Sequence, residues 1–164
     1  MKQRPAIGPV FVKKAAIMNV FAPVSTLMVT DLVTINPETS LRKVKEIFEE
    51  HSFHHLPVVN FRKIVGMVSR TDFDRFVGGL KKANDATTDL LEKTRAEEIM
   101  TKGLGKLEPD DRINVALEIF SKNWFHALPV VKDDELVGII TTQDIIRALL
   151  NEKPKEPHMV YEDL

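Results

Sequence analysis

The sequence predicts a mixed α/β fold of the α+β type, in which two βαββα repeats pack with pseudo-twofold symmetry into one module. Three observations lead to this prediction. The chain matches itself without gaps at an offset of 72 residues, the separation of Met28 and Met100. Each copy alternates short apolar strands with amphipathic helices, and a copy of about 50 residues buries too little surface to be stable alone. The composition, 43% hydrophobic and 29% charged, is that of a globular chain.

The internal repeat places residues 28–75 over residues 100–147. The coinciding positions include Met28 with Met100, Leu32 with Leu104, Pro37 with Pro109, residues 46–48 with 118–120, the run LPVV at 56–59 with 128–131, Gly66 with Gly138, and Asp72 with Asp144. Chance similarity of composition does not produce so many ungapped matches. Two copies of one supersecondary unit are therefore expected to stack and bury a common core.

The elements of each copy follow from local patterns. Residues 33–35 are expected to form a short strand, and Ser40 is placed to cap a helix that runs to about residue 51. Apolar residues at spacings of three and four give this helix one buried face: Leu41, Val44 and Phe48 in the first copy, and Ile113, Ala116, Leu117 and Phe120 in the second.

The second half of each copy reads as a hairpin followed by a helix. The apolar run LPVV predicts a buried strand, residues 60–63 and 132–135 predict polar turns, and IVGMVS and LVGIIT predict the returning strands. A second helix is expected at about residues 71–80 and 143–150. The resulting boundaries are an N-terminal arm at 1–23, a first repeat at 24–80, a linker at 81–95, a second repeat at 96–150 and a tail at 151–164.

Three segments lie outside the predicted repeats: the N-terminal arm, the linker and the C-terminal tail. The arm contains Pro5 and Pro9 and no cleavage pattern, so an extended arm that packs on the body is favoured over a targeting segment. Residues 81–95 are polar and read as a helix end and linker. The tail is expected to be loosely held or to dock on a neighbouring subunit.

Composition also excludes several classes of function. The chain has no cysteine, which excludes disulfide scaffolds, thiol nucleophiles and thiolate metal sites. A net charge of -1 provides no field for binding a polyphosphate backbone, so nucleic acid is not an expected partner. Apolar stretches are far shorter than the roughly 20 residues that span a bilayer. A cytoplasmic protein without membrane insertion is the expectation.

A pattern of glycine, two apolar residues, a hydroxyl residue, two variable residues and aspartate occurs twice. Its hydroxyl and carboxylate residues are Ser69 and Asp72 in the first copy and Thr141 and Asp144 in the second. A hydroxyl where a strand meets a helix N-terminus lies beside free N–H groups that suit a phosphate, and a carboxylate one turn later suits the hydroxyls of a ribose. The alternative is that these residues are only helix caps.

This paired pattern, with LPVV before it, resembles a tandem pair of CBS domains, the regulatory domains named after cystathionine beta-synthase. The resemblance covers about residues 24–150. It implies a regulatory module, with no required cofactor, that senses AMP, ADP, ATP or S-adenosylmethionine in clefts between the repeats. It also implies a homodimer formed through the helices after each motif, whose apolar residues include Phe73, Phe76, Leu80, Ile145, Ile146, Leu149 and Leu150.

The resemblance also implies which residues line the clefts. Asp72 and Asp144 would hold ribose, and Ser69 and Thr141 would face phosphate. The expected lining of the two repeats is completed by Thr34, Ile35, His54, His55, Pro57 and Arg70 in the first and by Lys106, Leu107, His126, Ala127, Pro129 and Thr142 in the second. Arg70 could clamp a phosphate where the second copy has the neutral Thr142, so the first cleft is expected to tolerate more phosphate charge.

The same sequence allows other interpretations. His51, His54 and His55 lie close together, but helix gives way to strand there, so a structural or adenine-contacting role is favoured over a metal site.

No catalytic triad, carboxylate pair or phosphate loop indicates an enzyme. A ligand-free scaffold for dimerisation or protein contacts remains the alternative function. The length of 164 residues leaves no room for a fused effector, so an unidentified separate effector is expected.

Overall fold

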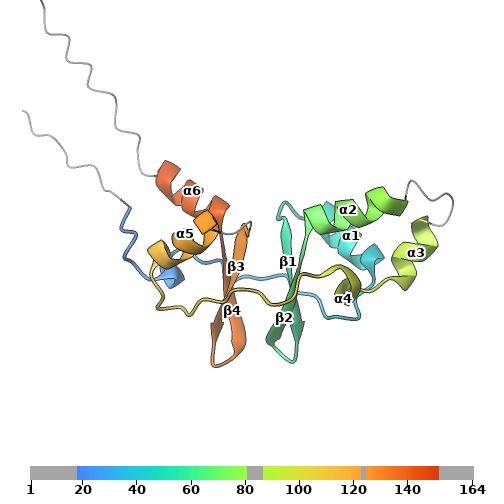
Figure 1. Ribbon diagram of the computed structural model, residues 1–164, viewed down its shortest axis with the longest axis horizontal. Coiled ribbons are helices and arrows are strands. Elements are labelled where there is room, and N and C mark those ends of the chain that lie inside the picture. Colours follow the sequence, from blue (N-terminus) through green and yellow to red (C-terminus); the bar gives the residue numbers. More distant parts are fainter. Residues whose placement is uncertain (1–17, 81–86, 123–124, 152–164) are drawn as a thin grey trace, which may run out of the picture.

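The computed structural model describes residues 18–80, 87–122 and 125–151. Two halves lie side by side, and each contains a two-stranded antiparallel hairpin with helices packed at one end (Figure 1). In chain order the elements are η1 (Val24–Thr26), α1 (Leu41–Glu50), β1 (His55–Asn60), β2 (Lys63–Ser69), α2 (Arg70–Leu80), α3 (Thr87–Lys93), α4 (Ala96–Ile99), α5 (Ile113–Lys122), β3 (Ala127–Lys132), β4 (Glu135–Thr141) and α6 (Thr142–Asn151). The mixed fold of two similar repeats is confirmed.

Helix α1 forms as the sequence predicts. The Ser40 hydroxyl accepts a hydrogen bond from the Lys43 N–H at 3.4 Å, which satisfies one of the free donors of the first turn. The apolar face of the helix is buried and consists of Leu41, Val44, Ile47 and Phe48. In the second repeat, α5 buries Ile113 and Ala116 in the same way.

The predicted strand at residues 33–35 is wrong in extent. Only Ile35 pairs with the sheet, in parallel with Val58: its N–H donates to Pro57 O at 3.0 Å, and its O accepts from the Val59 N–H at 2.8 Å. The chain then turns, because the Asn36 side chain accepts the Glu38 N–H at 3.0 Å. Leu107 makes the equivalent single bridge with Val130 in the second repeat.

Two-residue turns close both hairpins. Phe61 (φ 46°) and Arg62 (φ 69°) turn the first hairpin, and Asp133 (φ 52°) and Asp134 (φ 66°) turn the second. Positive φ at both central residues matches the type I′ turn, whose twist suits antiparallel strands. The Leu136 N–H donates to Arg62 O at 3.0 Å, so the two turns are also joined to each other.

Ion pairs reinforce the contact between the turns. Arg62 lies 3.1 Å from Glu135, and Lys63 Nζ lies 2.5 Å from Asp134 Oδ2. These pairs are solvent-exposed, so each adds little to stability, and the backbone hydrogen bond defines the register more strongly.

The two repeats exchange the segments that precede them. The Ala22 carbonyl, before the first repeat, accepts the N–H of Ile113 at the start of α5 at 3.0 Å. The Thr94 carbonyl, before the second repeat, accepts the N–H of Leu41 at the start of α1, also at 3.0 Å. Val24 is consequently buried in the core of the second repeat and Ala96 in the core of the first. Each leading segment therefore completes the other repeat.

The exchanged segments also complete the sheets. Val29 forms an isolated antiparallel bridge with Ile139, and Thr101 forms the equivalent bridge with Met67. Beside these bridges a methionine covers a glycine in each repeat: Met28 lies over Gly138, and Met100 lies over Gly66. The residues of each contact in one repeat are related by the offset of 72 residues to those of the equivalent contact in the other. These contacts therefore follow the pseudo-twofold symmetry.

The expected linker contains a helix. The stretch TTDLLEK forms α3, whose Leu91 is buried against α1 and whose Glu92 lies 3.4 Å from Arg42. Two adjacent leucines give this helix the apolar side that it needs for packing. The polar residues around them concealed this signal in the sequence. Residues 81–86 of this stretch lie outside the described residues.

The described end of the N-terminal arm packs on the body, as expected. Met18 and Ala22 contact the core of the second repeat, and the Asn114 N–H of α5 donates to Val20 O at 2.8 Å. The interpretations placed on residues 1–17 and 152–164 fall outside the described residues. Among the described helices, none has the length and apolarity needed to cross a bilayer.

The glycine contacts lead to a stability prediction. An added Cβ at Gly138 would lie 2.7 Å from Met28 Sδ and 3.2 Å from Val29 O, and one at Gly66 would lie 2.8 Å from Met100 Cγ. Gly138→Ala and Gly66→Ala are therefore each expected to lower the free energy of unfolding by about 1–3 kcal/mol through overpacking.

The matched control is Gly78→Ala in α2, where nothing lies within 4 Å of the added Cβ. It is expected to raise the free energy of unfolding by about 0.5–1 kcal/mol, because alanine favours helix more than glycine does. Urea unfolding measures all three variants. Stabilisation by Gly138→Ala or Gly66→Ala would contradict the proposed packing.

Candidate functional site

The hydroxyl and carboxylate of each motif lie against each other at a strand–helix junction. In the first repeat, the Ser69 hydroxyl donates to Asp72 Oδ2 at 2.6 Å, the Ser69 N–H donates to the same oxygen at 3.2 Å, and the Asp72 N–H donates to Ser69 Oγ at 3.1 Å. Thr141 and Asp144 repeat the arrangement at 2.6, 2.8 and 3.2 Å. Both motifs therefore begin helices α2 and α6 with the same reciprocal cap.

The capping role and a ligand-binding role make different demands on these groups. In both copies the Oδ2 oxygen is occupied, so a sugar hydroxyl would have to use Oδ1. Arg75 Nη1 lies 3.4 Å from Asp72 Oδ1. A ligand at the first motif would therefore approach a carboxylate that already has two protein partners.

Histidines stand beside both motifs. His55 opens β1 and pairs in register with Ser69 at the end of β2. The carbonyl of His54 accepts the Arg70 N–H at 2.8 Å, and the carbonyl of His126 accepts the Thr142 N–H at 3.1 Å. These bonds hold the residues that precede β1 and β3 against the first residues of α2 and α6.

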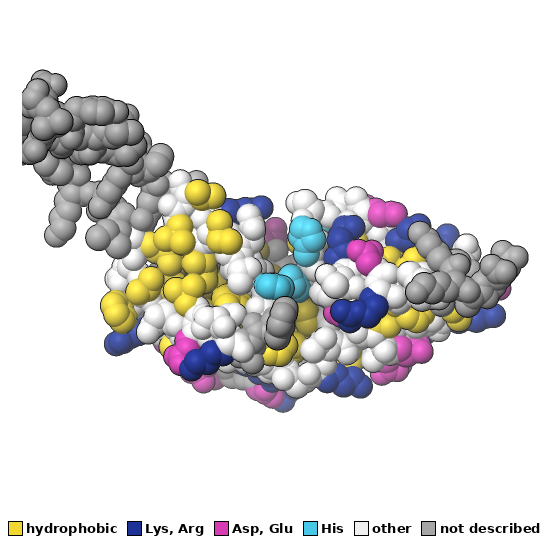
Figure 2. All heavy atoms as spheres, turned by 45° about the horizontal axis from the view of Figure 1, so that its top comes forward, with side chains coloured by type: hydrophobic (Ala, Val, Ile, Leu, Met, Phe, Trp, Pro, Cys, Tyr) yellow, Lys and Arg dark blue, Asp and Glu magenta, His cyan; other side chains and the backbone are white. Residues whose placement is uncertain are grey.

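The histidines of the two repeats influence one another. Burial lowers the pKa of His55, the nearby His126 and His54 lower it further, and Asp72 opposes these effects. Strands β2 and β4 of the two repeats contact each other, and Figure 2 shows histidine side chains gathered in the middle of the molecule, between the halves. The imidazoles of both repeats thus share one region.

An apolar cluster lies beside this region, where the repeats meet. It contains the buried Met67, Ala127 and Ile139, with Leu32 and Leu104 packed against them. Met67 and Ile139 are equivalent in the two copies, as are Leu32 and Leu104. Ala127 occupies the position that His55 has in the first repeat, so the junction is polar on one side and apolar on the other.

The structure divides the predicted site residues into two groups by exposure. The side chains of Ile35, Pro57, Leu107, Ala127 and Pro129 are buried. Exposed or half-buried side chains belong to Thr34, His54, His55, Ser69, Arg70, Asp72, Lys106, His126, Thr141, Thr142 and Asp144. The buried residues can shape a cleft or offer backbone atoms, whereas only the second group presents side chains to a ligand.

Two basic side chains have protein partners that the sequence did not indicate. The Arg70 guanidinium hydrogen-bonds the Phe48 carbonyl near the end of α1 and lies 5.0 Å from the centre of the Phe48 ring. Lys106 Nζ lies 3.9 Å from Asp134 Oδ1 in the second hairpin turn. A phosphate would have to compete with these contacts. The only sequence signal was that Arg70 has no basic counterpart in the second repeat.

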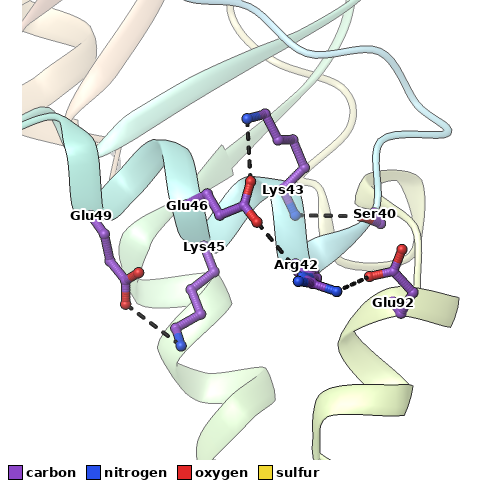
Figure 3. A network of polar contacts seen from close by, with 7 residues as sticks. All are labelled: Ser40, Arg42, Lys43, Lys45, Glu46, Glu49 and Glu92. Carbon is purple, nitrogen blue, oxygen red and sulfur yellow. Dashed lines mark hydrogen bonds and ion pairs between the residues drawn. The ribbon is translucent and has the colours of Figure 1, made fainter.

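A separate polar groove lies between α1 and α3. It has a volume of about 270 Å³ and is lined by Ser40, Arg42, Lys43, Glu46 and Glu92. Figure 3 shows its basic and acidic groups turned toward each other, with Arg42 contacting both Glu46 and Glu92. Its two carboxylates disfavour a phosphate, and it contains none of the predicted site residues.

Among residues 18–80, 87–122 and 125–151, no three His, Asp or Glu side chains are grouped as metal ligands would be. The candidate site therefore consists of the two Ser/Thr–Asp pairs and the histidines between them.

Comparison with known proteins identifies the repeat. The model of the family described as "CBS domain" matches residues 24–79 and 96–151. An uncharacterized protein of Methanocaldococcus jannaschii is 33% identical over 131 residues, which cover 73% of this chain and 46% of that protein. The chain thus spans less than half of this relative.

Two solved structures share the fold and hold ligands. CBSX2 in complex with AMP is 25% identical with a TM-score of 0.67, covering 79% of this chain and 97% of CBSX2. The CBS domain pair of protein MJ0100, in complex with 5′-methylthioadenosine and S-adenosyl-L-methionine, is 27% identical with a TM-score of 0.66, covering 81% and 99%. With both repeats matched, the chain belongs to the CBS domain family and carries a tandem pair of these domains.

Proposed function

We propose that the protein is a regulatory sensor that binds AMP, ADP, ATP or S-adenosylmethionine between its CBS repeats and modulates a separate partner. The observation that carries the proposal is the duplicated Ser/Thr–Asp pair, held at equivalent helix starts beside histidines from both repeats. The AMP complex of CBSX2 and the S-adenosylmethionine complex of the MJ0100 pair support an adenosine-containing ligand.

The proposed contacts follow from the chemistry of the groups. Asp72 and Asp144 offer carboxylate oxygens to ribose hydroxyls, which donate hydrogen bonds. Ser69 and Thr141, with the first N–H groups of α2 and α6, suit a phosphate. Backbone atoms near Ile35 and Leu107 would flank the adenine. A ligand held by groups of both repeats favours one relative placement of the halves, and a partner could read that placement.

The proposal includes no catalytic role. In each motif the hydroxyl donates its hydrogen bond to the carboxylate of the helix cap. Among the described residues, no imidazole is hydrogen-bonded to either hydroxyl, so neither hydroxyl has a base to activate it. We place the sensor in the cytoplasm as a homodimer, without nucleic acid or membrane partners.

The second candidate is a ligand-free scaffold for protein contacts. One observation favours it: the hydroxyl, carboxylate and guanidinium groups of the first motif already have partners within the protein. A scaffold needs no cleft residues to be available. The two candidates differ in whether an adenosine compound stabilises the fold.

A thermal-melt panel separates sensor from scaffold. AMP, ADP, ATP and S-adenosylmethionine are each added at millimolar concentration, and the expected result is a higher Tm with at least one of them. A ligand at 100 times its Kd stabilises the native state by about 2.7 kcal/mol. No shift with any of the four compounds would favour the scaffold.

The carboxylates assign the ligand to a motif. Asp72→Asn and Asp144→Asn retain one oxygen acceptor but lose the charge, and each is expected to weaken binding at its own motif about 10- to 100-fold in calorimetry, since a hydrogen bond to a charged group contributes about 1.5–3 kcal/mol. Asp74→Asn, an exposed change on the same helix, is the control. Unchanged affinity in both motif variants would contradict the proposed ribose contacts.

Arg70 distinguishes the two motifs in phosphate preference. We expect the Ser69–Asp72 motif to tolerate more phosphate charge, so Arg70→Ala lowers ATP affinity more than AMP affinity. It also lowers the free energy of unfolding by about 1–2 kcal/mol, because the contact with Phe48 is lost. Thr142→Ala, at the equivalent position, removes no charge, so it is expected to leave the ratio of ATP affinity to AMP affinity unchanged. Equal affinity of both motifs for AMP and ATP in calorimetry, with no change in Arg70→Ala, would contradict this preference.

His55 gives a dependence of stability on pH. Its folded-state pKa is lowered, mainly by burial, whereas an unfolded histidine titrates near about 6.5. Below that pH the unfolded chain takes up a proton that the folded chain excludes, so stability falls as pH decreases from about 6.5 toward the lower folded pKa. His55→Gln should reduce this slope in urea titrations, and His51→Gln, on an exposed side chain, should retain it. An unchanged slope in His55→Gln would refute the assignment.

A further inference from the structure

The first motif has an imidazole on its neighbouring strand where the second motif has a methyl group. His55 opens β1 and pairs in register with Ser69, the hydroxyl residue of the first motif. The offset of 72 residues relates His55 to Ala127, which opens β3 and pairs in register with Thr141. The hydrogen bonds of the two Ser/Thr–Asp pairs are alike, so the imidazole is a chemical difference between two similar sites.

Titratable groups from three segments act on the His55 side chain. They are His54 before β1, His126 before β3 and Asp72 on α2. The side chain is half-buried, and burial is the main reason why its pKa is lowered. Since an ordinary histidine titrates near about 6.5, the imidazole of His55 is uncharged at neutral pH when no ligand is bound.

Two basic side chains of the predicted lining already have acceptors within the protein. The Arg70 guanidinium hydrogen-bonds the Phe48 carbonyl, and Lys106 Nζ lies 3.9 Å from Asp134 Oδ1. A phosphate at the first motif would also lie near the carboxylate of Asp72. Its negative charge therefore needs a further positive group, and an imidazole beside the motif can become one by taking up a proton.

We infer that a phosphate-bearing adenosine compound binds at the first motif together with a proton, which His55 takes up. This inference rests on the proposed function and adds a regulation of the same site by pH. An imidazolium donates hydrogen bonds from both ring nitrogens, and a hydrogen bond between charged groups is roughly twice as strong as a neutral one. The phosphate thus offsets the burial that keeps the free imidazole uncharged.

The same proton links the ligand to the junction between the repeats. His126 belongs to the second repeat, but it lowers the pKa of His55 in the first. Figure 2 shows histidine side chains gathered between the halves. Imidazolium groups repel one another unless an anion lies close to them. A bound phosphate removes this repulsion, so it favours the arrangement in which the halves stay together.

The affinity then depends on pH with a defined sign. A bound phosphate raises the pKa of His55 above its value in the free protein, so binding takes up protons in the interval between the two values. Affinity rises as pH falls through this interval, by at most about tenfold per pH unit for one proton. An uncharged adenosine compound takes up no proton, and the cation S-adenosylmethionine binds less tightly as the imidazole gains charge.

Calorimetry of the full chain tests the proton uptake with three ligands of different charge. They are the 5′-methyl phosphodiester of AMP, 5′-methylthioadenosine and S-adenosylmethionine. The diester keeps one negative charge, whereas a phosphate monoester itself titrates near about pH 6. From about pH 7.5 to about pH 6 we expect a roughly three- to tenfold gain in affinity for the diester, less than about twofold change for methylthioadenosine and a loss for S-adenosylmethionine.

Substitution of His55 assigns the proton. In His55→Gln and His55→Ala, diester affinity should become independent of pH, and its binding enthalpy should no longer vary with the ionisation enthalpy of the buffer. His51→Gln, which changes an exposed imidazole outside both motifs, is the matched control and should retain both effects. Circular dichroism checks that each variant is folded. A pH dependence that survives in both His55 variants overturns the inference.

The outcomes separate this inference from the sensor itself. Diester binding with the same affinity at both pH values and without proton uptake retains the sensor and overturns the coupling to His55. An equal gain for methylthioadenosine also overturns the coupling, because that ligand has no phosphate. Absence of binding by all three compounds contradicts the sensor and the coupling together.

Discussion

The structure depends on the exchange of leading segments between the two repeats. The first N–H of α1, that of Leu41, and the first N–H of α5, that of Ile113, have acceptors outside their own repeats. The carbonyls of Thr94 and Ala22 accept these hydrogen bonds, each from the segment that precedes the other repeat. Burial of Val24 and Ala96 follows from the same exchange. A single repeat would lose both the apolar contact and the backbone partner, so the pair forms one folding unit.

The candidate site inherits its geometry from this exchange. The bridges of Val29 to Ile139 and Thr101 to Met67 pair with the edges of β4 and β2 that face away from their hairpin partners. Those strands end at Thr141 and Ser69, which start α6 and α2. The exchanged segments therefore position both motifs. A ligand that contacts both repeats would bind across the same junction that holds the repeats together.

The two repeats share a backbone plan but differ in the chemistry of a few side chains. Arg70 ties α2 to the Phe48 carbonyl, while Thr142 makes no such link possible. His55 faces the junction where the second repeat has Ala127, and the exposed face of α6 is apolar where that of α2 is charged. The two repeats thus share a scaffold, and differences at single positions make its two ends chemically different.

The sequence by itself determined the duplication, the helix faces, the hairpins and the places of the motifs, because periodicity and turn chemistry are local. The sequence patterns predicted too long a strand at 33–35 and did not predict helix α3. Only the tertiary structure decided that the segments before the repeats cross over, that Arg70 binds Phe48, and that Lys106 turns to Asp134. Periodicity shows that a residue is buried but not which core receives it, and the partner of a long charged side chain depends on neighbours distant in sequence.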